Sequence, residues 1–475
     1  MTDAGSRTLQ FTAAAAGNLN IVACGAILGW TSPILPKLSR NNPISSDNQL
    51  LRPITTDEGS WIGSLVALGV MFGSFASGYL GEWLGRKRGL LMSTFPFIVG
   101  WLLVGTAKHI GQIYAGRFIL GLGVSIPFTL LPMYIGEISE ASIRGALGSF
   151  LQLFITFGFL FSYSVGPYIS YTIFWLLCTS LHIGFYVCFM IMPESPYFLL
   201  SKGREVEAAE ALARFRGKSV AGVEKEIEQI QVEIDEAYRV KTSWADVFKD
   251  RVNRKAIVLT SILMTFQEFM GIDVVLFYTE DIFRNAGTKN TAMSAIIIGV
   301  VQMLSSVLTP LVVDRSGRKI LLIISSVGSG ITVGILGTFF YLQTIEYDLS
   351  SVWWVPLATL VVYMIAYSIG WGPIPWTVMG EMFAPAVKPK ASSICVCAIW
   401  TFSFLTTKFF TNVEKAFGTH TGFWFFSFCC AINIVFIVMF FPETKGKTLS
   451  EIQKKLSRWN SSPIANEKTS VNQET

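Results

Sequence analysis

Twelve apolar segments of about 20 residues each dominate this 475-residue sequence and restrict what it can fold into. An α-helix needs about 20 residues to cross the ~30 Å hydrocarbon core of a bilayer. Because backbone N–H and C=O groups find no water there, a spanning segment has to be helical. The sequence therefore predicts an all-α membrane protein with twelve transmembrane helices, at roughly 11–36, 59–80, 89–107, 111–135, 145–168, 171–192, 256–283, 291–313, 319–342, 352–380, 391–413 and 420–441.

The composition excludes several other classes of protein. Only 15% of the residues are charged, 51% are hydrophobic, and the mean hydropathy is +0.50. Soluble domains carry about 25% charged residues, so an ordinary soluble enzyme and a disordered chain are excluded. The net charge of +5 does not indicate a nucleic-acid partner, because the location of the charges matters more than their sum. The expected partner is the lipid bilayer.

The distribution of Lys and Arg predicts the orientation in the membrane. If the N-terminus is cytoplasmic, 28 of the 37 Lys and Arg residues fall on cytoplasmic segments and 8 on the opposite side. Short loops alone show the same bias, as the positive-inside rule requires. We therefore expect both termini to be cytoplasmic.

A change in composition divides the chain into parts. The segment 193–255 is rich in Glu, Lys and Ala, and Glu205 to Phe215 has helical spacing. It separates six spans from six. The predicted parts are an N-terminal six-helix half (1–192), a cytoplasmic helical linker (193–255), a C-terminal six-helix half (256–441) and a cytoplasmic tail (442–475) with one short helix at Leu449 to Arg458.

Three motifs of the first half recur in order in the second half, at offsets of 232 to 249 residues. Each pair ends corresponding spans, which indicates two duplicated halves. Transporters are commonly built from such repeats, with the substrate site near the midplane between them. The pairs are Glu82-Trp-Leu-Gly-Arg86-Lys with Asp314-Arg-Ser-Gly-Arg318-Lys, Gly136-Glu137 with Gly380-Glu381, and Pro193-Glu194-Ser with Pro442-Glu443-Thr.

These motifs, with Pro132-Met-Tyr-Ile-Gly-Glu137, Arg144-Gly145 and Gly372-Pro373-Ile-Pro375-Trp376, resemble the sugar porter family of the major facilitator superfamily. The resemblance covers about residues 11–450. The stretch Thr56 to Ser64 further resembles the insect facilitated trehalose and glucose transporter-like branch. The resemblance implies the major facilitator fold and a sugar substrate. We therefore expect a monomeric plasma-membrane protein that is not an enzyme and needs no cofactor or metal.

A sugar site needs hydrogen-bonding side chains for the hydroxyl groups and an aromatic side chain for the apolar ring face. The resemblance places sugar-binding positions on spans 5, 7, 8, 10 and 11. Where the family has a Gln-Gln…Gly-Ile-Asn run in span 7, this chain replaces two amides by acids. The expected substrate-binding residues are Gln152, Gln267, Glu268, Asp273, Gln302, Trp376, Trp400 and Ser403.

Glu268 and Asp273 leave two interpretations open. Carboxyl groups inside a membrane are costly unless they are paired, protonated or hydrated. They could accept hydrogen bonds from sugar hydroxyls, or one could carry a proton. Proton-coupled members of the family carry an Asp in span 1, and residues 11–36 contain no acid, so Arg117 lacks that partner. This difference favours passive uniport over proton symport.

The resemblance also implies a charged gate at the cytoplasmic helix ends and a hinge in span 10. Two positions depart from the family, since Glu82 replaces an Asp and Tyr197 replaces an Arg. Proline removes a helix hydrogen bond, so the hinge residues could bend the span. The expected gate residues are Glu82, Arg86, Glu137, Arg144, Glu194, Asp314, Arg318, Glu381 and Glu443, and the hinge residues are Gly372, Pro373 and Pro375.

Three functions remain in order of preference. The first is facilitative uniport of a hexose or trehalose by alternating access. The second is proton-coupled sugar symport through Glu268 and Asp273. The third is a receptor that binds sugar without moving it, and such receptors usually carry a longer cytoplasmic tail.

Overall fold

A computed structural model describes residues 6–39, 50, 52–140, 142–239, 244–383, 387–445, 447 and 449–458. All regular structure in these ranges is helical. Twelve helical segments are long and apolar enough to cross a membrane, which confirms the predicted all-α architecture of twelve membrane helices.

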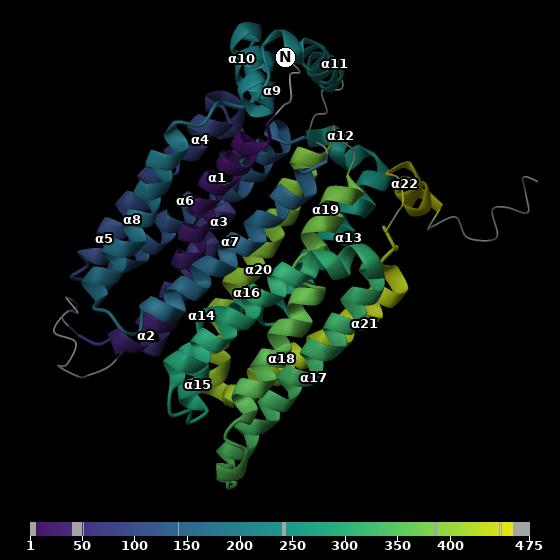
Figure 1. Cartoon of the computed structure of the whole chain (residues 1–475). Helices are drawn as coiled ribbons and strands as arrows, with labels where there is room; N and C mark the ends of the chain where they lie inside the picture. The colour runs from purple at the N-terminus through teal and green to yellow at the C-terminus, as the bar shows by residue number, and fades with distance from the viewer. Residues whose placement is uncertain are drawn as a thin grey trace, which may run out of the picture.

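The first six spans form the N-terminal half, drawn in purple and blue in Figure 1. The second span begins with a capping box, in which Thr55 Oγ1 accepts from the Glu58 amide at 3.2 Å and Glu58 Oε2 accepts from the Thr55 amide at 2.8 Å. The helices are α1 (Thr8–Gly29), α2 (Thr31–Ser39), α3 (Thr56–Leu84), α4 (Arg86–Met92), α5 (Thr94–Gly105), α6 (Ile110–Ile138), α7 (Arg144–Val165) and α8 (Tyr171–Met190).

Short helices follow the sixth span and lie together at one end of the molecule (Figure 1). We call this end the linker end and the opposite end the distal end. Arg216 fastens these helices to the N-terminal half, because its Nη1 donates to Ile138 O at 2.7 Å and its Nη2 contacts Glu226 at 2.6 Å. The helices are α9 (Pro196–Ser201), α10 (Glu205–Arg216), η1 (Ala221–Val223), α11 (Glu224–Arg239) and α12 (Trp244–Lys249).

The last six spans form the C-terminal half, drawn in green and yellow in Figure 1. Two of them, the seventh and the tenth, are interrupted. The helices are α13 (Arg251–Glu268), α14 (Ile272–Phe277), α15 (Thr279–Asn285), α16 (Thr291–Ser316), α17 (Arg318–Thr344), η2 (Ser350–Val352), α18 (Val355–Ile369), α19 (Ile374–Met382), α20 (Lys388–Phe417) and α21 (Thr419–Phe440).

Both ends of the described chain lie at the linker end (Figure 1). The Ser6 amide donates to Arg216 O at 2.8 Å, next to α10. The tail helix α22 (Leu449–Arg458) packs on α13, and Lys255 Nζ donates to Leu456 O at 2.9 Å. The short helix expected in the tail is therefore present, and both chain ends lie on one side of the bundle.

The two halves contact each other along two pairs of helices. Helix α3 packs against α20, and α7 packs against α16. Large apolar side chains such as Phe72, Tyr79 and Phe428 are exposed on the outer surface of the bundle. In a membrane protein this surface faces lipid, so such exposure is expected.

Candidate functional site

The seventh span breaks between α13 and α14, and the break carries the two unexpected acids. Gly271 has a φ of +86°, which favours glycine because it lacks Cβ. Glu268 is the last residue of α13, and Asp273 is the second residue of α14. The Tyr363 hydroxyl donates to Met270 O at 3.1 Å and so satisfies one backbone carbonyl that the break leaves without a helix partner.

Gln267 joins this break to the break in the tenth span. Its Nε2 donates to the Tyr367 hydroxyl at 2.8 Å and to Gly372 O at 3.3 Å. The tenth span is interrupted between Ile369 and Ile374, where Gly372 and Pro373 stand. The predicted hinge residues therefore lie at a real interruption of the helix, next to the expected sugar-binding Gln.

The two acids lie together. The carboxyl groups of Glu268 and Asp273 lie within hydrogen-bonding reach of each other, and the Ser403 hydroxyl donates to Asp273 Oδ2. Glu268 is 5% exposed and Ser403 is 1% exposed. Three of the eight expected substrate-binding residues therefore form one cluster, made by α13, α14 and α20.

Three of the expected binding residues each carry a buried oxygen atom that has no hydrogen-bond partner among the described residues. They are Gln267 Oε1, Glu268 Oε2 and Gln302 Oε1. Their side chains are between 4% and 6% exposed. A buried polar atom without a partner costs about 1–3 kcal/mol, and most such atoms in proteins are satisfied. Three unpartnered acceptors at expected binding positions are suited to accept hydrogen bonds from the hydroxyl groups of a sugar.

Three other expected binding residues, Gln152, Gln302 and Trp400, lie on helices at the contact between the halves, and Trp376 lies on α19 within the C-terminal half. Gln152 is on α7, which packs against α16, the helix that carries Gln302. Trp400 of α20 contacts Phe128 of α6 in an edge-to-face arrangement, with ring centroids 6.2 Å apart. Trp376 is half-buried on α19, directly after the interruption of the tenth span. Among the described residues, no hydrogen bond or ion pair joins Gln152 or Trp376 to the acid cluster.

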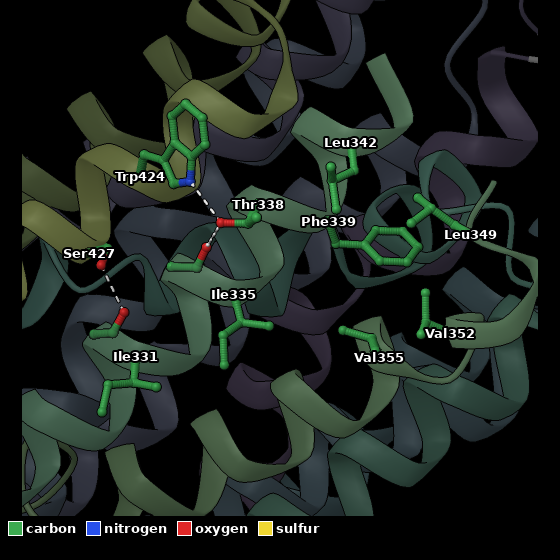
Figure 2. A pocket seen from close by; sticks show the side chains of 12 residues that line it. Ile331, Ile335, Thr338, Phe339, Leu342, Leu349, Val352, Val355, Trp424 and Ser427 are labelled. Carbon is green, nitrogen blue, oxygen red and sulfur yellow. Dashed lines mark hydrogen bonds between the residues drawn. The ribbon is translucent and has the colours of Figure 1, made fainter. Parts of the chain in front are cut away.

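A cavity of about 520 Å³ lies elsewhere, between α17, α18 and α21 (Figure 2). Its lining is mostly apolar, and its polar side chains are already hydrogen-bonded. Trp424 Nε1 donates to Thr338 Oγ1 at 3.4 Å, and Ser427 Oγ donates to Gly330 O at 2.8 Å. It contains none of the expected binding residues. A sugar would lose its hydration there without compensation, so this cavity is not the expected sugar site.

Ion pairs at the linker end join expected gate residues within each half. In the N-terminal half, Arg86 Nη2 lies 2.8 Å from Glu137 Oε1, and Ser195 Oγ donates to Glu137 Oε2. In the C-terminal half, Arg318 Nη2 lies 3.0 Å from Glu381 Oε1. Both pairs are partly buried, which strengthens them relative to surface pairs.

The carboxylate of Glu194 caps the N-terminus of helix α4. Its Oε1 accepts from the Lys87 amide at 2.8 Å and from the Ser195 amide at 2.9 Å. Gly85 precedes α4 with a φ of +96°, and a Cβ there would lie 2.5 Å from Glu194 Oε2. A carboxylate at a helix N-terminus is stabilised by the free amides and by the helix dipole.

Glu443 repeats this arrangement at the start of α17. Burial would raise the pKa of its carboxyl group, but the amides of Lys445, Lys319, Arg318 and Thr444 donate to it and lower its pKa below the usual value. Gly317 occupies the position of Gly85, with a φ of +89°. The repeated sequence motif therefore corresponds to a repeated helix cap.

Other expected gate residues do not form ion pairs in the described part of the chain. Glu82 and Arg144 are exposed, and Arg144 Nη2 donates to Ser139 O at 3.4 Å. The side chain of Asp314 lies outside the described residues. Tyr197, which stands where the family has Arg, donates its hydroxyl to Glu233 Oε2 at 3.0 Å and so contacts α11.

At the distal end, a buried lysine joins the two halves. Lys408 of α20 is 5% exposed, and its Nζ lies 2.6 Å from Asp57 Oδ1 and 2.8 Å from Ser60 Oγ, both on α3. The same ammonium group lies 4.7 Å from the ring centre of Trp61. In the sequence, Lys408 is one of the eight basic residues assigned to the side opposite the cytoplasm, although it falls within the predicted span 391–413. Its position inside a predicted span was the signal that it needs a partner.

Two further contacts close the halves at this end. The Tyr163 hydroxyl of α7 donates to Leu276 O at 2.5 Å. Tyr278 donates its hydroxyl to Thr407 O at 3.1 Å, and a Cβ at Gly63 of α3 would lie 2.5 Å from the same hydroxyl oxygen. The distal ends of the halves are therefore in close contact in this conformation.

Known proteins with similar sequences show the family to which this chain belongs. Residues 19–456 match the sequence model of the family described as "Sugar (and other) transporter". The chain is 38% identical to the facilitated trehalose transporter Tret1 of Polypedilum vanderplanki, over 94% of this chain and 88% of that protein. It is 35% identical to Tret1 of Anopheles gambiae over 94% of this chain, and it spans 56% of that longer protein.

Solved structures show the same fold. The xylose transporter XylE of E. coli, in a partially occluded inward-open conformation, is 26% identical, with a TM-score of 0.76 over 93% of this chain and 100% of that one. An inward-open structure of the same transporter also has a TM-score of 0.76, over 94% of this chain and 99% of that chain, at 25% identity. The matched length, the repeated motifs and the twelve helices agree, and this chain belongs to the sugar transporter family of the major facilitator superfamily.

Proposed function

We propose that this protein is a facilitative uniporter that carries a hexose or trehalose across the plasma membrane, not an enzyme. The main support for a sugar site at these helices is the set of buried, unpartnered oxygen atoms of Gln267, Glu268 and Gln302. Sugar hydroxyl groups can donate to such atoms. The insect relatives are named as trehalose transporters, which adds trehalose to the candidates.

The environment of Arg117 supports uniport. Its Nη1 donates to Ile27 O at 2.8 Å and its Nε donates to Ile62 O at 3.0 Å, and it lies 5.2 Å from the Trp30 ring centre. The span Thr8–Ser39 contains no Asp or Glu. Arg117 thus binds backbone carbonyls of α1 and α3 and braces these helices.

Proton symport is the second candidate, because two carboxyl groups, Glu268 and Asp273, lie close together inside the seventh span and one of them could carry a proton. Sugar uptake into proteoliposomes separates the two. For a uniporter, an inward proton gradient leaves the initial rate unchanged and the final internal sugar concentration equal to the external one. Accumulation above that level, lost in Asp273→Asn, would establish symport instead.

Counterflow tests whether the protein is instead a receptor that binds sugar without moving it. A uniporter exchanges labelled external sugar for unlabelled internal sugar without any gradient of protons. A protein that only senses sugar shows binding without counterflow.

We further propose alternating access with the linker end in the cytoplasm. The positive-inside bias and the position of both chain ends support this orientation. The described conformation has its distal end closed by the contacts of Lys408 and Tyr163 with the other half and by the close approach of Tyr278 to Gly63. A single chain supplies both halves of the site, which supports a monomer as the working unit.

The ion pairs at the linker end are proposed to control opening there. Glu137→Gln removes the negative charge that pairs with Arg86 and replaces one of the two accepting oxygens by an NH2 donor. We expect uptake to fall about five- to tenfold, since ~1.4 kcal/mol corresponds to tenfold. Exchange of the charges in Arg86→Glu with Glu137→Arg should recover part of the loss. Glu207→Gln is the matched control, because the Arg204–Glu207 pair is exposed on the linker and should leave uptake unchanged. Wild-type uptake in Glu137→Gln would contradict the gate.

A further inference from the structure

The ammonium group of Lys408 on α20 finds its partners on the opposite half of the molecule. Lys408 is 5% exposed, and its Nζ donates to Asp57 Oδ1 at 2.6 Å and to Ser60 Oγ at 2.8 Å. The centre of the Trp61 ring lies 4.7 Å from the same nitrogen. An ammonium group has three donors, and two acceptors and one aromatic face match that number. All three partners belong to the start of α3.

The start of α3 holds these partners in position. Its capping box is made by Thr55 and Glu58, so the Asp57 carboxylate is not used to cap the helix. The Ser60 hydroxyl donates to Asp57 O at 2.7 Å, which orients its oxygen to accept from Lys408. The Asp57 side chain is 56% exposed, so water reaches one side of the ion pair. The fold of α3 therefore presents two acceptors at fixed positions to the other half.

One face of α20 carries a row of such contacts between the halves. Trp400, Phe404 and Lys408 are spaced four residues apart, which places them on the same face of the helix. Trp400 contacts Phe128 of α6, and Phe404 contacts Trp61 of α3 with ring centroids 6.0 Å apart. Lys408 is the charged member of the row. Separation of the halves at the distal end breaks its three contacts together, because each of them crosses between the halves.

We infer that Lys408, Asp57, Ser60 and Trp61 form a latch that holds the distal end closed and makes the transporter asymmetric. The inference rests on the proposed alternating access. A state that is closed at the distal end cannot bind sugar from that side, and an apparent affinity is reduced by the fraction of molecules in the competent state. The latch therefore weakens binding of sugar from the distal side and strengthens binding from the linker side.

Transport in both directions tests this asymmetry. Lys408→Met keeps an apolar side chain and removes the charge, and Asp57→Asn removes the charge of the partner. Each should lower the half-saturating sugar concentration on the distal side and raise it on the linker side. Their ratio should change about fivefold, the upper range for a partly exposed ion pair. Lys415→Met is the matched control, because Lys415 is exposed near the end of the same helix.

Access to a buried cysteine gives a measurement that does not need transport. Thr407→Cys places a thiol at a fully buried position of the distal end. In the purified full-length protein, a hydrophilic thiol reagent should modify this cysteine faster when Lys408→Met or Asp57→Asn is also present, after subtraction of the rate of the native cysteines. The two substitutions change the local charge in opposite directions, so an electrostatic effect on the thiol cannot raise both rates.

The outcomes separate the latch from the proposed function. Sugar transport with an unchanged ratio in both variants overturns the latch and leaves transport standing. Modification that is no faster in either variant than in Thr407→Cys alone also overturns it. If both variants are modified faster but the wild-type protein moves no sugar, the latch stands and the proposed transport function fails.

Discussion

Replacement of Gln267 by leucine is expected to reduce sugar uptake at least about tenfold while the protein still reaches the membrane. The leucine side chain has nearly the same size but removes both the unpartnered Oε1 and the Nε2 that holds Tyr367 and Gly372. A lost hydrogen bond costs ~0.5–1.5 kcal/mol and a stranded buried partner ~1–3 kcal/mol. Since ~1.4 kcal/mol corresponds to a factor of ten, the combined loss exceeds tenfold.

The measurement is initial uptake of labelled sugar well below saturation, corrected for the amount of protein at the cell surface. Gln231→Leu is the matched control, because Gln231 is half-buried on α11 at the linker end, where its Nε2 donates to Asp235 Oδ1 at 2.9 Å. Thermal unfolding of both purified variants shows whether the Gln267 variant is folded. A folded Gln267→Leu protein with near-normal uptake would remove Gln267 from the sugar site.

Replacement of Gly63 by leucine is expected to hold the distal ends of the halves apart and to lower uptake by more than tenfold. Even a Cβ at this position would lie 2.5 Å from the Tyr278 hydroxyl oxygen and 3.2 Å from Tyr278 Cζ. The obstruction lies between the halves, because Gly63 belongs to α3 and Tyr278 follows α14. A transporter that cannot close its distal end cannot complete an alternating cycle, and a ligand-driven shift of a few kcal/mol does not overcome such a clash.

Gly78→Leu is the matched control on the same helix, since nothing lies within 4 Å of a Cβ at Gly78. Closure is measured directly with Thr407→Cys, because Thr407 is fully buried at the distal end. A membrane-impermeant thiol reagent should modify this cysteine faster when Gly63→Leu is also present, after subtraction of the rate of the seven native cysteines. Equal rates with and without Gly63→Leu would contradict the distal contact. The Gly63→Ala, Tyr278→Phe double variant should recover part of the uptake, because it removes the nearest clashing atom.

Much of the candidate site was accessible from sequence because it depends on local patterns. The Gly-Pro-Ile-Pro run predicts an interruption of the tenth span, and the helix does break between Ile369 and Ile374. The repeated Glu194 and Glu443 predict paired arrangements in the two halves. The structure adds the physical reason, since each carboxylate caps the helix that follows a glycine with positive φ. Their roles in gating, and the roles of the expected binding residues, stay predictions.

The contacts between the halves could not be predicted in the same way. Lys408 and Asp57 are separated by 351 residues, and only the packing of α3 against α20 brings their charges together. Likewise, Glu268 and Asp273 were expected in the site, but the close approach of their carboxyl groups depends on how the chain turns at Gly271.

The sequence by itself determined that the chain is a helical membrane protein with two duplicated halves, because the length of apolar runs, the placement of basic residues and the repeated motifs are local properties of the chain. Tertiary structure decided which charges pair, which buried oxygen atoms are left without a partner, and which end of the bundle is closed. Those features arise where helices from distant parts of the sequence meet. Rotation of one helix by the angle between two successive residues would alter each of them.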